Sequence, residues 1–190
     1  KKEEENKGEE TKENIEKYAG ADAIRTDLKG KCLMPAFIDA HSHFVMSGQM
    51  SMMANLSECE SFNDIIVALK KYMKDNKITK ENVIIGFGYD HNFLKENAQP
   101  DKRVLDQVSA EIPIFILHVS AHLACANSAA LKIAGIDENT ADPEGGVIGR
   151  FFDSTEPNGY VEEAALNLLQ IAIFPRIKFD IKANYEKVQE

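Results

Sequence analysis

The sequence predicts an α/β fold in which short buried strands alternate with helices. Two nearly continuous apolar runs, at 83–87 and 114–117, are rich in β-branched and aromatic residues, which is typical of strands buried on both faces. Before them, apolar residues recur at helical spacing over 61–75. The chain has 190 residues, 44% of them hydrophobic, so it can bury a core of its own.

The first 35 residues contain little that can form a core. Residues 1–14 are almost all Lys, Glu, Asn, Gly and Thr, a composition that does not fold by itself. Residues 23–24 and 32–34 are short apolar stretches on either side of a turn sequence that includes Gly30, which predicts strand, turn and strand. Pro35 then leads into a further apolar stretch that we expect to be a strand.

The helix expected at 61–75 begins with a Ser-x-x-Asp start signal at Ser61 and Asp64. Its apolar face follows the i, i+3, i+4, i+7 pattern and consists of Phe62, Ile65, Ile66 and Leu69. The opposite face carries Lys70, Lys71 and Lys74.

Two further helices are expected in the second half of the chain. Asn127 is a good N-cap for a helix at 128–134, and Gly135 is a good residue to end it. The next helix is predicted to start after Gly159 and to run through Leu169.

A long irregular tract, residues 137–158, is expected between these helices. It contains three glycines and two prolines and is longer than an ordinary connection. Such long loops are usually functional or cover a site. A last amphipathic helix is predicted at 180–190. We expect residues 61–170 to form a compact unit, with a core that includes Ile65, Ile66, Leu69, Ile84, Ile116, Leu117 and Leu131.

Charge and composition exclude several classes of partner. The formal net charge is −9, and no basic stripe interleaved with aromatic residues is present, which argues against nucleic acid and against an anionic membrane surface. No apolar run approaches the roughly 20 residues of a membrane-spanning helix, and the start lacks a signal-peptide pattern, so we expect a cytoplasmic protein. The remaining partners are a small-molecule substrate and a second copy of the chain.

The three cysteines have no paired spacing. An odd number without such spacing indicates neither a disulfide framework nor a thiolate metal site. We expect Cys32, Cys59 and Cys125 to be reduced and buried.

The strongest chemical signal is the segment Asp39-Ala40-His41-Ser42-His43. In a strand, Asp39, His41 and His43 would project to one side, close enough for the two imidazoles to share a metal ion and for the carboxylate to orient a ring. The alternative is a pair of ordinary polar residues at a strand end.

The context of this segment resembles the amidohydrolase superfamily. Residues 33–43, LMPAFIDAHSH, are similar to its first barrel strand, in which Pro-Gly-Phe-Ile-Asp-x-His-x-His carries two metal ligands. Four further segments, in the same order and spacing, resemble the group that includes N-substituted formamide deformylases and exoenzyme-regulatory proteins. They are 86–92 (GFGYDHN), 120–131 (SAHLACANSAAL), 142–150 (DPEGGVIGR) and 156–165 (EPNGYVEEAA).

The sequence departs from this group at four positions. Ala36 and Ala121 stand where the group usually has glycine, Cys125 where it has tryptophan, and Ser120 where it more often has aspartate. These changes leave the candidate ligands in place but imply a reshaped substrate pocket.

The resemblance implies that the chain is a fragment of a metal-dependent (β/α)8-barrel hydrolase with part of an accessory β-sandwich. The implied division is 1–35 as the polar segment and sandwich part, 36–55 as the first barrel strand and following loop, 56–170 as an α/β insertion, and 171–190 as a C-terminal helix. A complete barrel takes about 250 residues, and the family draws its other ligands from later strands. We therefore expect this chain alone to be inactive and to bind metal weakly or not at all.

The implied activity is hydrolysis of amide-like, non-peptide C–N bonds by a metal-activated water, with zinc or another divalent ion. By resemblance, His41 and His43 hold the metal and Asp39 supports them. The other candidate catalytic residues are His122, Glu163, Asp90 and His91.

Each of these candidates has a plainer interpretation. His122 could be a hydrogen-bonded buried histidine, Glu163 a solvated glutamate, and Asp90 with His91 part of a turn. His118, at the end of an apolar run, is interpreted as a buried histidine.

Two other functions remain open from the sequence. One is a non-catalytic regulatory or interaction module on the same scaffold. The other is a structural zinc site closed by His41, His43, His118 and His122, although sites of four histidines without cysteine are uncommon.

Overall fold

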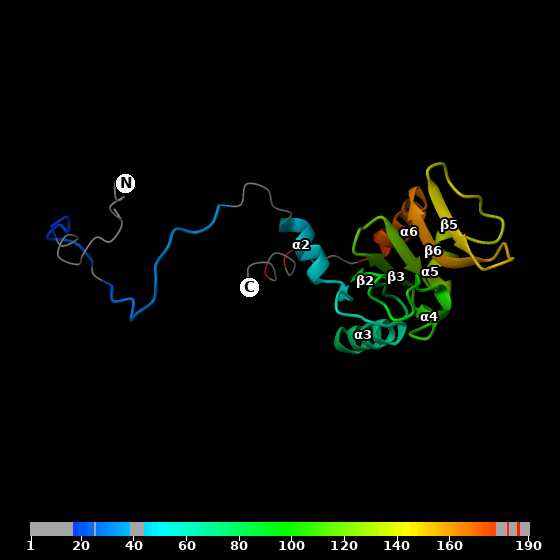
Figure 1. The fold of residues 1–190 in the computed structure, drawn as a ribbon, viewed down its shortest axis with the longest axis horizontal. Coiled ribbons are helices and arrows are strands. Elements are labelled where there is room, and N and C mark those ends of the chain that lie inside the picture. The colour runs from blue at the N-terminus through cyan, green and yellow to red at the C-terminus, as the bar shows by residue number, and fades with distance from the viewer. Residues whose placement is uncertain (1–16, 25, 39–43, 178–181, 183–185, 187–190) are drawn as a thin grey trace, which may run out of the picture. The chain divides into compact units, whose positions relative to one another are not determined.

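The computed structural model describes residues 17–24, 26–38 and 44–177, together with Lys182 and Glu186. The chain divides into two compact units, Lys1–Ser42 and His43–Glu190. All the strands and helices found in the described residues belong to the second unit (Figure 1).

The first unit has the predicted turn, but its described residues do not form the predicted strands. The Lys31 N–H donates to the Leu28 carbonyl at 3.0 Å, and Gly30 adopts a φ of 78°. Residues 23–24 and 32–34 are irregular, and Ile24 and Leu33 are exposed. The strand prediction was wrong here because a strand needs a backbone partner, and apolar composition does not supply one.

Within the described part of the second unit, six strands form one mixed sheet. Their spatial order is β1 (Ala54–Asn55), β2 (Ile84–Tyr89), β3 (Ile114–His118), β4 (Leu123–Ala126), β6 (Pro157–Glu163) and β5 (Gly146–Arg150). β1, β2 and β3 run parallel; β4 is antiparallel to both β3 and β6, and β5 is antiparallel to β6. The α/β fold and both predicted buried strands are confirmed.

Helices cover this sheet. They are α2 (Phe44–Ser51), α3 (Phe62–Asp75), α4 (Lys102–Asp106), α5 (Ser128–Ala134), α6 (Ala164–Ile173) and the short 3-10 helix η1 (Phe174–Arg176). α3 lies between β1 and β2 in the chain, and α4 lies between β2 and β3. α2 occupies a segment that we had expected to be part of a loop.

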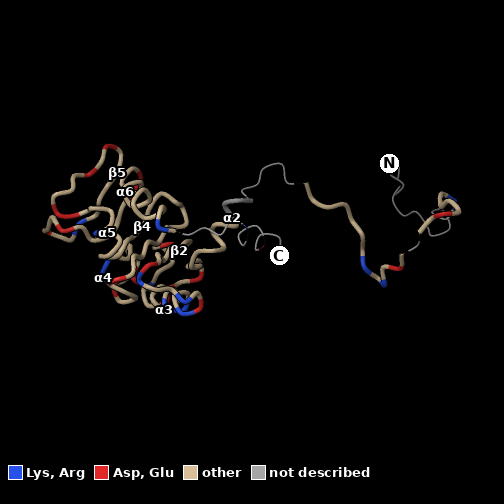
Figure 2. The backbone as a smooth tube through the Cα atoms, turned by 180° about the vertical axis from the view of Figure 1, so that it is seen from behind, with Lys and Arg blue, Asp and Glu red and all other residues tan. Residues whose placement is uncertain are grey.

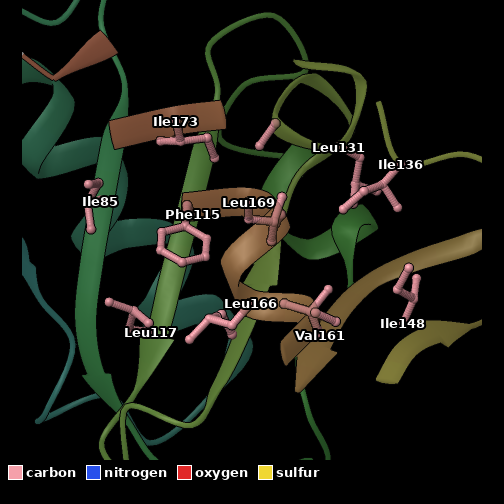
Figure 3. Close-up of a cluster of buried hydrophobic side chains, with 14 residues drawn as sticks. Ile85, Phe115, Leu117, Leu131, Ile136, Ile148, Val161, Leu166, Leu169 and Ile173 are labelled. Carbon is pink, nitrogen blue, oxygen red and sulfur yellow. The ribbon is translucent and has the colours of Figure 1, made fainter. Parts of the chain in front are cut away.

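Alternation along the central strands divides the core between the two faces of the sheet. On β3, Phe115 and Leu117 belong to a cluster that includes residues of α5 and α6, whereas Ile114 and Ile116 belong to a second cluster with residues of α3 and α4. Figure 3 shows Phe115 and Leu117 among the side chains of the first cluster, near Leu166 of α6. Both faces of the strand are apolar because each carries a helical layer.

The predicted core is largely confirmed. Six of its members are buried, namely Ile65, Leu69, Ile84, Ile116, Leu117 and Leu131. Ile66 is half-buried and packs at the edge of the second cluster. It lies next to Ile65 on α3, so it cannot face the sheet as directly.

Both predicted helix starts are confirmed by their capping hydrogen bonds. Ser61 Oγ accepts from the Asp64 N–H at 3.2 Å and donates to the Asp64 carboxylate at 2.7 Å. The buried Asn127 side chain accepts from the Ala130 N–H at 2.9 Å, and Gly135 ends α5 with a φ of 67°. These ends follow from local chemistry that is visible in the sequence.

The segment after the long tract differs from its prediction. Residues 157–163 form strand β6 rather than a helix, and α6 begins only at Ala164. β5, at 146–150, lies inside the tract expected to be irregular, and it pairs with β6. Pairing between β5 and β6 stabilises both strands. The helical propensity of residues 160–169 is a local property and gives no sign of such pairing. The helix predicted at 180–190 lies mostly outside the described residues.

Figure 2 shows acidic and basic positions interspersed along α3. Among the described helices, none is long and apolar enough to cross a membrane. All three cysteines are free, as predicted, but only Cys125 is buried, while Cys59 is partly exposed and Cys32 is exposed.

Candidate active site at one edge of the sheet

The candidate residues in the described part of the chain share one edge of the sheet. Asp90 and His91 directly follow β2, His118 is the last residue of β3, His122 directly precedes β4, and Glu163 ends β6. β2, β3 and β6 run in the same direction and β4 runs the opposite way, so all these positions lie at the carboxyl end of the parallel strands. Ligands and catalytic groups are commonly found at this edge in α/β folds.

Asp90, His91 and His118 form a close cluster. His91 Nδ1 lies 3.3 Å from His118 Nε2, His118 Nε2 lies 3.4 Å from Asp90 Oδ1, and His91 Nδ1 lies 3.8 Å from the same oxygen. His118 is buried, whereas the other two side chains are partly exposed. This is a group of three potential metal-ligand atoms that faces solvent on one side.

Asp90 is held in place by Asn92. The backbone N–H and the side-chain amide of Asn92 donate to Asp90 Oδ1 at 2.9 Å and 2.8 Å. These hydrogen bonds, led by the backbone one and joined by the neighbouring His118, hold the pKa of Asp90 below its ordinary value despite the opposing effect of burial. The carboxylate is therefore ionised at neutral pH.

Tyr89 and Ser120 both contact the His118 ring. Tyr89 packs edge-on against it, with the ring centroids 5.4 Å apart. His118 Nδ1 lies 2.9 Å from Ser120 Oγ and 3.1 Å from the Ser120 backbone nitrogen. A neutral imidazole carries one proton, so Nδ1 either accepts from the backbone N–H or donates to the hydroxyl, and this choice sets the state of Nε2.

His122 and Glu163 form a second pair. His122 Nδ1 lies 3.1 Å from a Glu163 carboxylate oxygen, and the Glu163 N–H donates to the His122 carbonyl at 3.0 Å. Both side chains are largely exposed, so the pair can reach a molecule in solution. A carboxylate on Nδ1 leaves Nε2 free to give or take a proton.

The backbone around this second pair is unusual. Ala121 has a φ of 61° and Glu163 a φ of 47°, both in the left-handed region that favours glycine. Strain of this kind persists only where the surroundings hold it, and it is concentrated at functional sites.

The structure groups the predicted residues in a way the sequence did not show. It brings Asp90 and His91 together with His118, and it pairs His122 with Glu163. The metal pair His41 and His43, with Asp39, lies outside the described residues.

His118 is buried at the end of a strand, as predicted, but the sequence analysis did not place it beside Asp90 and His91. A signal was available: Asp90 and His118 each come at the end of a buried apolar run, and parallel neighbouring strands bring their carboxyl ends together. The register confirms it, with Tyr89 beside His118.

The four-histidine zinc hypothesis gains no support, because His118 groups with Asp90 and His91 while His122 is bonded to Glu163.

The chain matches a known protein family. Residues 26–187 match the amidohydrolase family. The match covers most of the chain, and the chain is a member of that family.

Two curated proteins are similar to most of this chain. The N-substituted formamide deformylase of Arthrobacter pascens is 30% identical over 164 residues, which are 85% of this chain and 30% of that protein. The exoenzymes regulatory protein AepA of Pectobacterium carotovorum is 30% identical over 147 residues, 74% of this chain and 31% of that protein.

Solved structures extend the similarity to three dimensions. An uncharacterized metal-dependent hydrolase from Pyrococcus furiosus superposes with a TM-score of 0.55 at 25% identity, covering 82% of this chain and 29% of that one. A second, from Pyrococcus horikoshii, gives a TM-score of 0.53 at 26% identity, covering 82% and 28%. The chain thus has a hydrolase scaffold and spans about 30% of the length of the curated relatives it matches.

Proposed function

We propose that this chain forms part of a metal-dependent hydrolase that cleaves amide-like, non-peptide C–N bonds in small molecules. The observation that carries the proposal is the family match over 26–187, which includes the Asp-x-His-x-His segment. Similarity to an N-substituted formamide deformylase supports a C–N bond as the target.

The donor set at 39–43 fits a divalent transition metal. Two imidazoles separated by one residue are suitable zinc ligands, and a neighbouring carboxylate can orient one ring through its second nitrogen. When bound, such an ion supplies a water of lowered pKa and polarises a carbonyl. His41 and His43 would hold it, supported by Asp39.

The described residues add proton transfer and positioning to this scheme. His122 can pass a proton to a leaving nitrogen through Nε2, because its Nδ1 is bonded to the Glu163 carboxylate and Nε2 stays free. Asp90 and His91 border the same edge of the sheet and can bind polar groups of a substrate.

This chain alone is not expected to catalyse the reaction. A catalytic zinc site uses three protein ligands, and the Asp-x-His-x-His segment offers two histidines. The remaining ligands are expected from a longer protein, in keeping with relatives of which this chain matches about 30%.

The test compares a longer protein that contains this chain with the 190-residue chain, both supplied with zinc and assayed on N-formyl amines, acyl-amino acids and simple amides. The longer protein should hydrolyse one of these substrates. His41→Ala should abolish turnover, and His122→Ala should lower kcat by about 100-fold or more, the usual contribution of a general acid. The 190-residue chain should be inactive.

A matched control is Glu162→Ala, which removes the neighbouring carboxylate on β6 without touching the His122–Glu163 pair. If it lowers kcat as much as His122→Ala does, the acid assignment is wrong. Turnover by the 190-residue chain would contradict the proposed division of the site.

A further inference from the structure

We infer that Asp90, His91 and His118 bind a divalent transition-metal ion, and that this site does not require His41 or His43. All three ligands come from the carboxyl ends of β2 and β3, inside one compact unit. The inference goes beyond the proposed function, which assigns the metal to the His-x-His pair.

The three donor atoms have the spacing of ligands around one ion. Their separations are 3.3, 3.4 and 3.8 Å. A point equidistant from all three atoms and in their plane lies about 2.0 Å from each, the usual length of Zn–N and Zn–O bonds. Little movement is needed to accept an ion.

The chemistry of the donors selects the class of ion. Two imidazoles and one carboxylate suit zinc, cobalt or nickel, whereas magnesium and calcium prefer sets made only of oxygen. Three protein ligands leave a fourth position for water, and the 30% exposed His91 side chain keeps that side of the cluster accessible.

The surroundings already hold the ligands in a binding arrangement. Asn92 bonds Asp90 Oδ1 with two donors, which fix the position of this carboxylate oxygen. The Ser120 N–H donates to His118 Nδ1 at 3.1 Å, so the neutral ring carries its proton on Nε2; an ion on Nε2 requires that proton to move to Nδ1, where Ser120 Oγ, 2.9 Å away, can accept it. Ligands oriented in this way by their neighbours are characteristic of metal sites.

The competing explanation is a direct hydrogen bond between the two imidazoles, which are 3.3 Å apart. In that case a proton occupies the space between the rings and no ion binds. Both explanations use the same heavy-atom positions, so only metal binding separates them.

The experiment is a zinc titration of the 190-residue chain after chelator treatment, followed by calorimetry, with cobalt absorption as a report of coordination. We expect one equivalent to bind, both in the unaltered chain and in the His41→Ala, His43→Ala double variant. His91→Ala, at the partly exposed ligand, should weaken binding by more than about tenfold, as should Asp90→Asn. His122→Ala is the matched control and should bind as the unaltered chain does.

Far-UV circular dichroism of each variant establishes that it folds, and His91→Ala keeps the test decisive if the buried His118→Ala does not fold. The inference is overturned if no zinc binds, if His91→Ala and Asp90→Asn bind as well as the unaltered chain, or if the double variant loses the ion. Zinc bound at Asp90, His91 and His118 also revises the expectation that this chain binds metal weakly or not at all. That expectation then holds only for the His-x-His pair. Failure of the proposed hydrolase activity would leave this binding result unchanged.

Discussion

At the scale of single residues, the clearest feature is a strained alanine beside a candidate catalytic histidine. Ala121 has a φ of 61°, and the related proteins that its segment resembles usually have glycine there. A side chain in this conformation costs about 1–2 kcal/mol per residue, a cost that glycine avoids. Ala121 therefore keeps a left-handed backbone conformation at a cost that glycine would avoid.

We predict that Ala121→Gly stabilises the chain by roughly 0.5–1 kcal/mol, because relief of the strain outweighs the greater flexibility of unfolded glycine. Urea unfolding of the 190-residue chain measures the change. The control is Ala129→Gly within α5, where the same replacement should cost about 1 kcal/mol because the backbone is helical. Destabilisation by both replacements would show that Ala121 is not strained.

At the scale of elements, local chemistry determined where helices begin, and pairing determined where strands form. α3 and α5 start at the residues whose side chains accept a backbone N–H, as the sequence indicated. β6 replaced the first part of a predicted helix because it lies between β4 and β5. The close packing there is visible at Gly159, where an added Cβ would lie 2.3 Å from the Ala126 carbonyl oxygen.

We predict that the cap of α3 makes stability depend on pH in acid. The Ser61 hydroxyl, the Glu60 N–H and the nearby Lys95 hold the pKa of Asp64 below its ordinary value of 3.8. A lowered folded-state pKa gives a contribution that is fully present above the unfolded-state pKa and is lost as pH falls through the folded-state pKa. The stability difference between the unaltered chain and Asp64→Asn should therefore shrink as pH drops below 3.8.

Urea unfolding between about pH 7 and about pH 2 measures this difference. The control is the Ser61→Ala background, which itself costs about 1 kcal/mol and removes the main hydrogen bond to Asp64. In that background, Asp64→Asn should show a weaker pH dependence. An equal dependence in both backgrounds would mean that Ser61 does not lower the pKa of Asp64.

At the scale of the whole molecule, the buried cores lie in one unit. Both clusters consist of residues between Ala54 and Ile173, whereas Phe37 and Ile38 in the described part of the first unit are about 95% exposed. Apolar burial is the main source of stability, so the described residues of the first unit contribute little to it.

We predict that a chain beginning at His43 unfolds cooperatively, with a free energy of unfolding within about 1 kcal/mol of that of the 190-residue chain. Both core clusters, which lie between Ala54 and Ile173, are retained in it. Urea unfolding followed by circular dichroism compares the two chains. A loss of several kcal/mol would show that residues 1–42 pack on the core.

The sequence by itself determined the α/β class, two buried strands, the helices at 61–75 and 128–134 with their capped ends, and most of the core. These features depend on periodicity and on hydrogen bonds between residues a few positions apart, which a linear pattern records. Five similar segments also indicated the amidohydrolase family. The sequence also indicated Asp90, His91, His122 and Glu163 as candidate catalytic residues, but it did not show which of them lie together.

Tertiary structure alone decided how these candidates are grouped. His118 joins Asp90 and His91 because β2 and β3 are parallel neighbours in register, and Glu163 reaches His122 because β6 pairs with β4 across 41 positions of sequence. Strand pairing joins residues that are distant along the chain, and its stability comes from partners that no local window contains. The predicted start of the helix after Gly159 was wrong for the same reason, because residues 160–163 pair as part of β6.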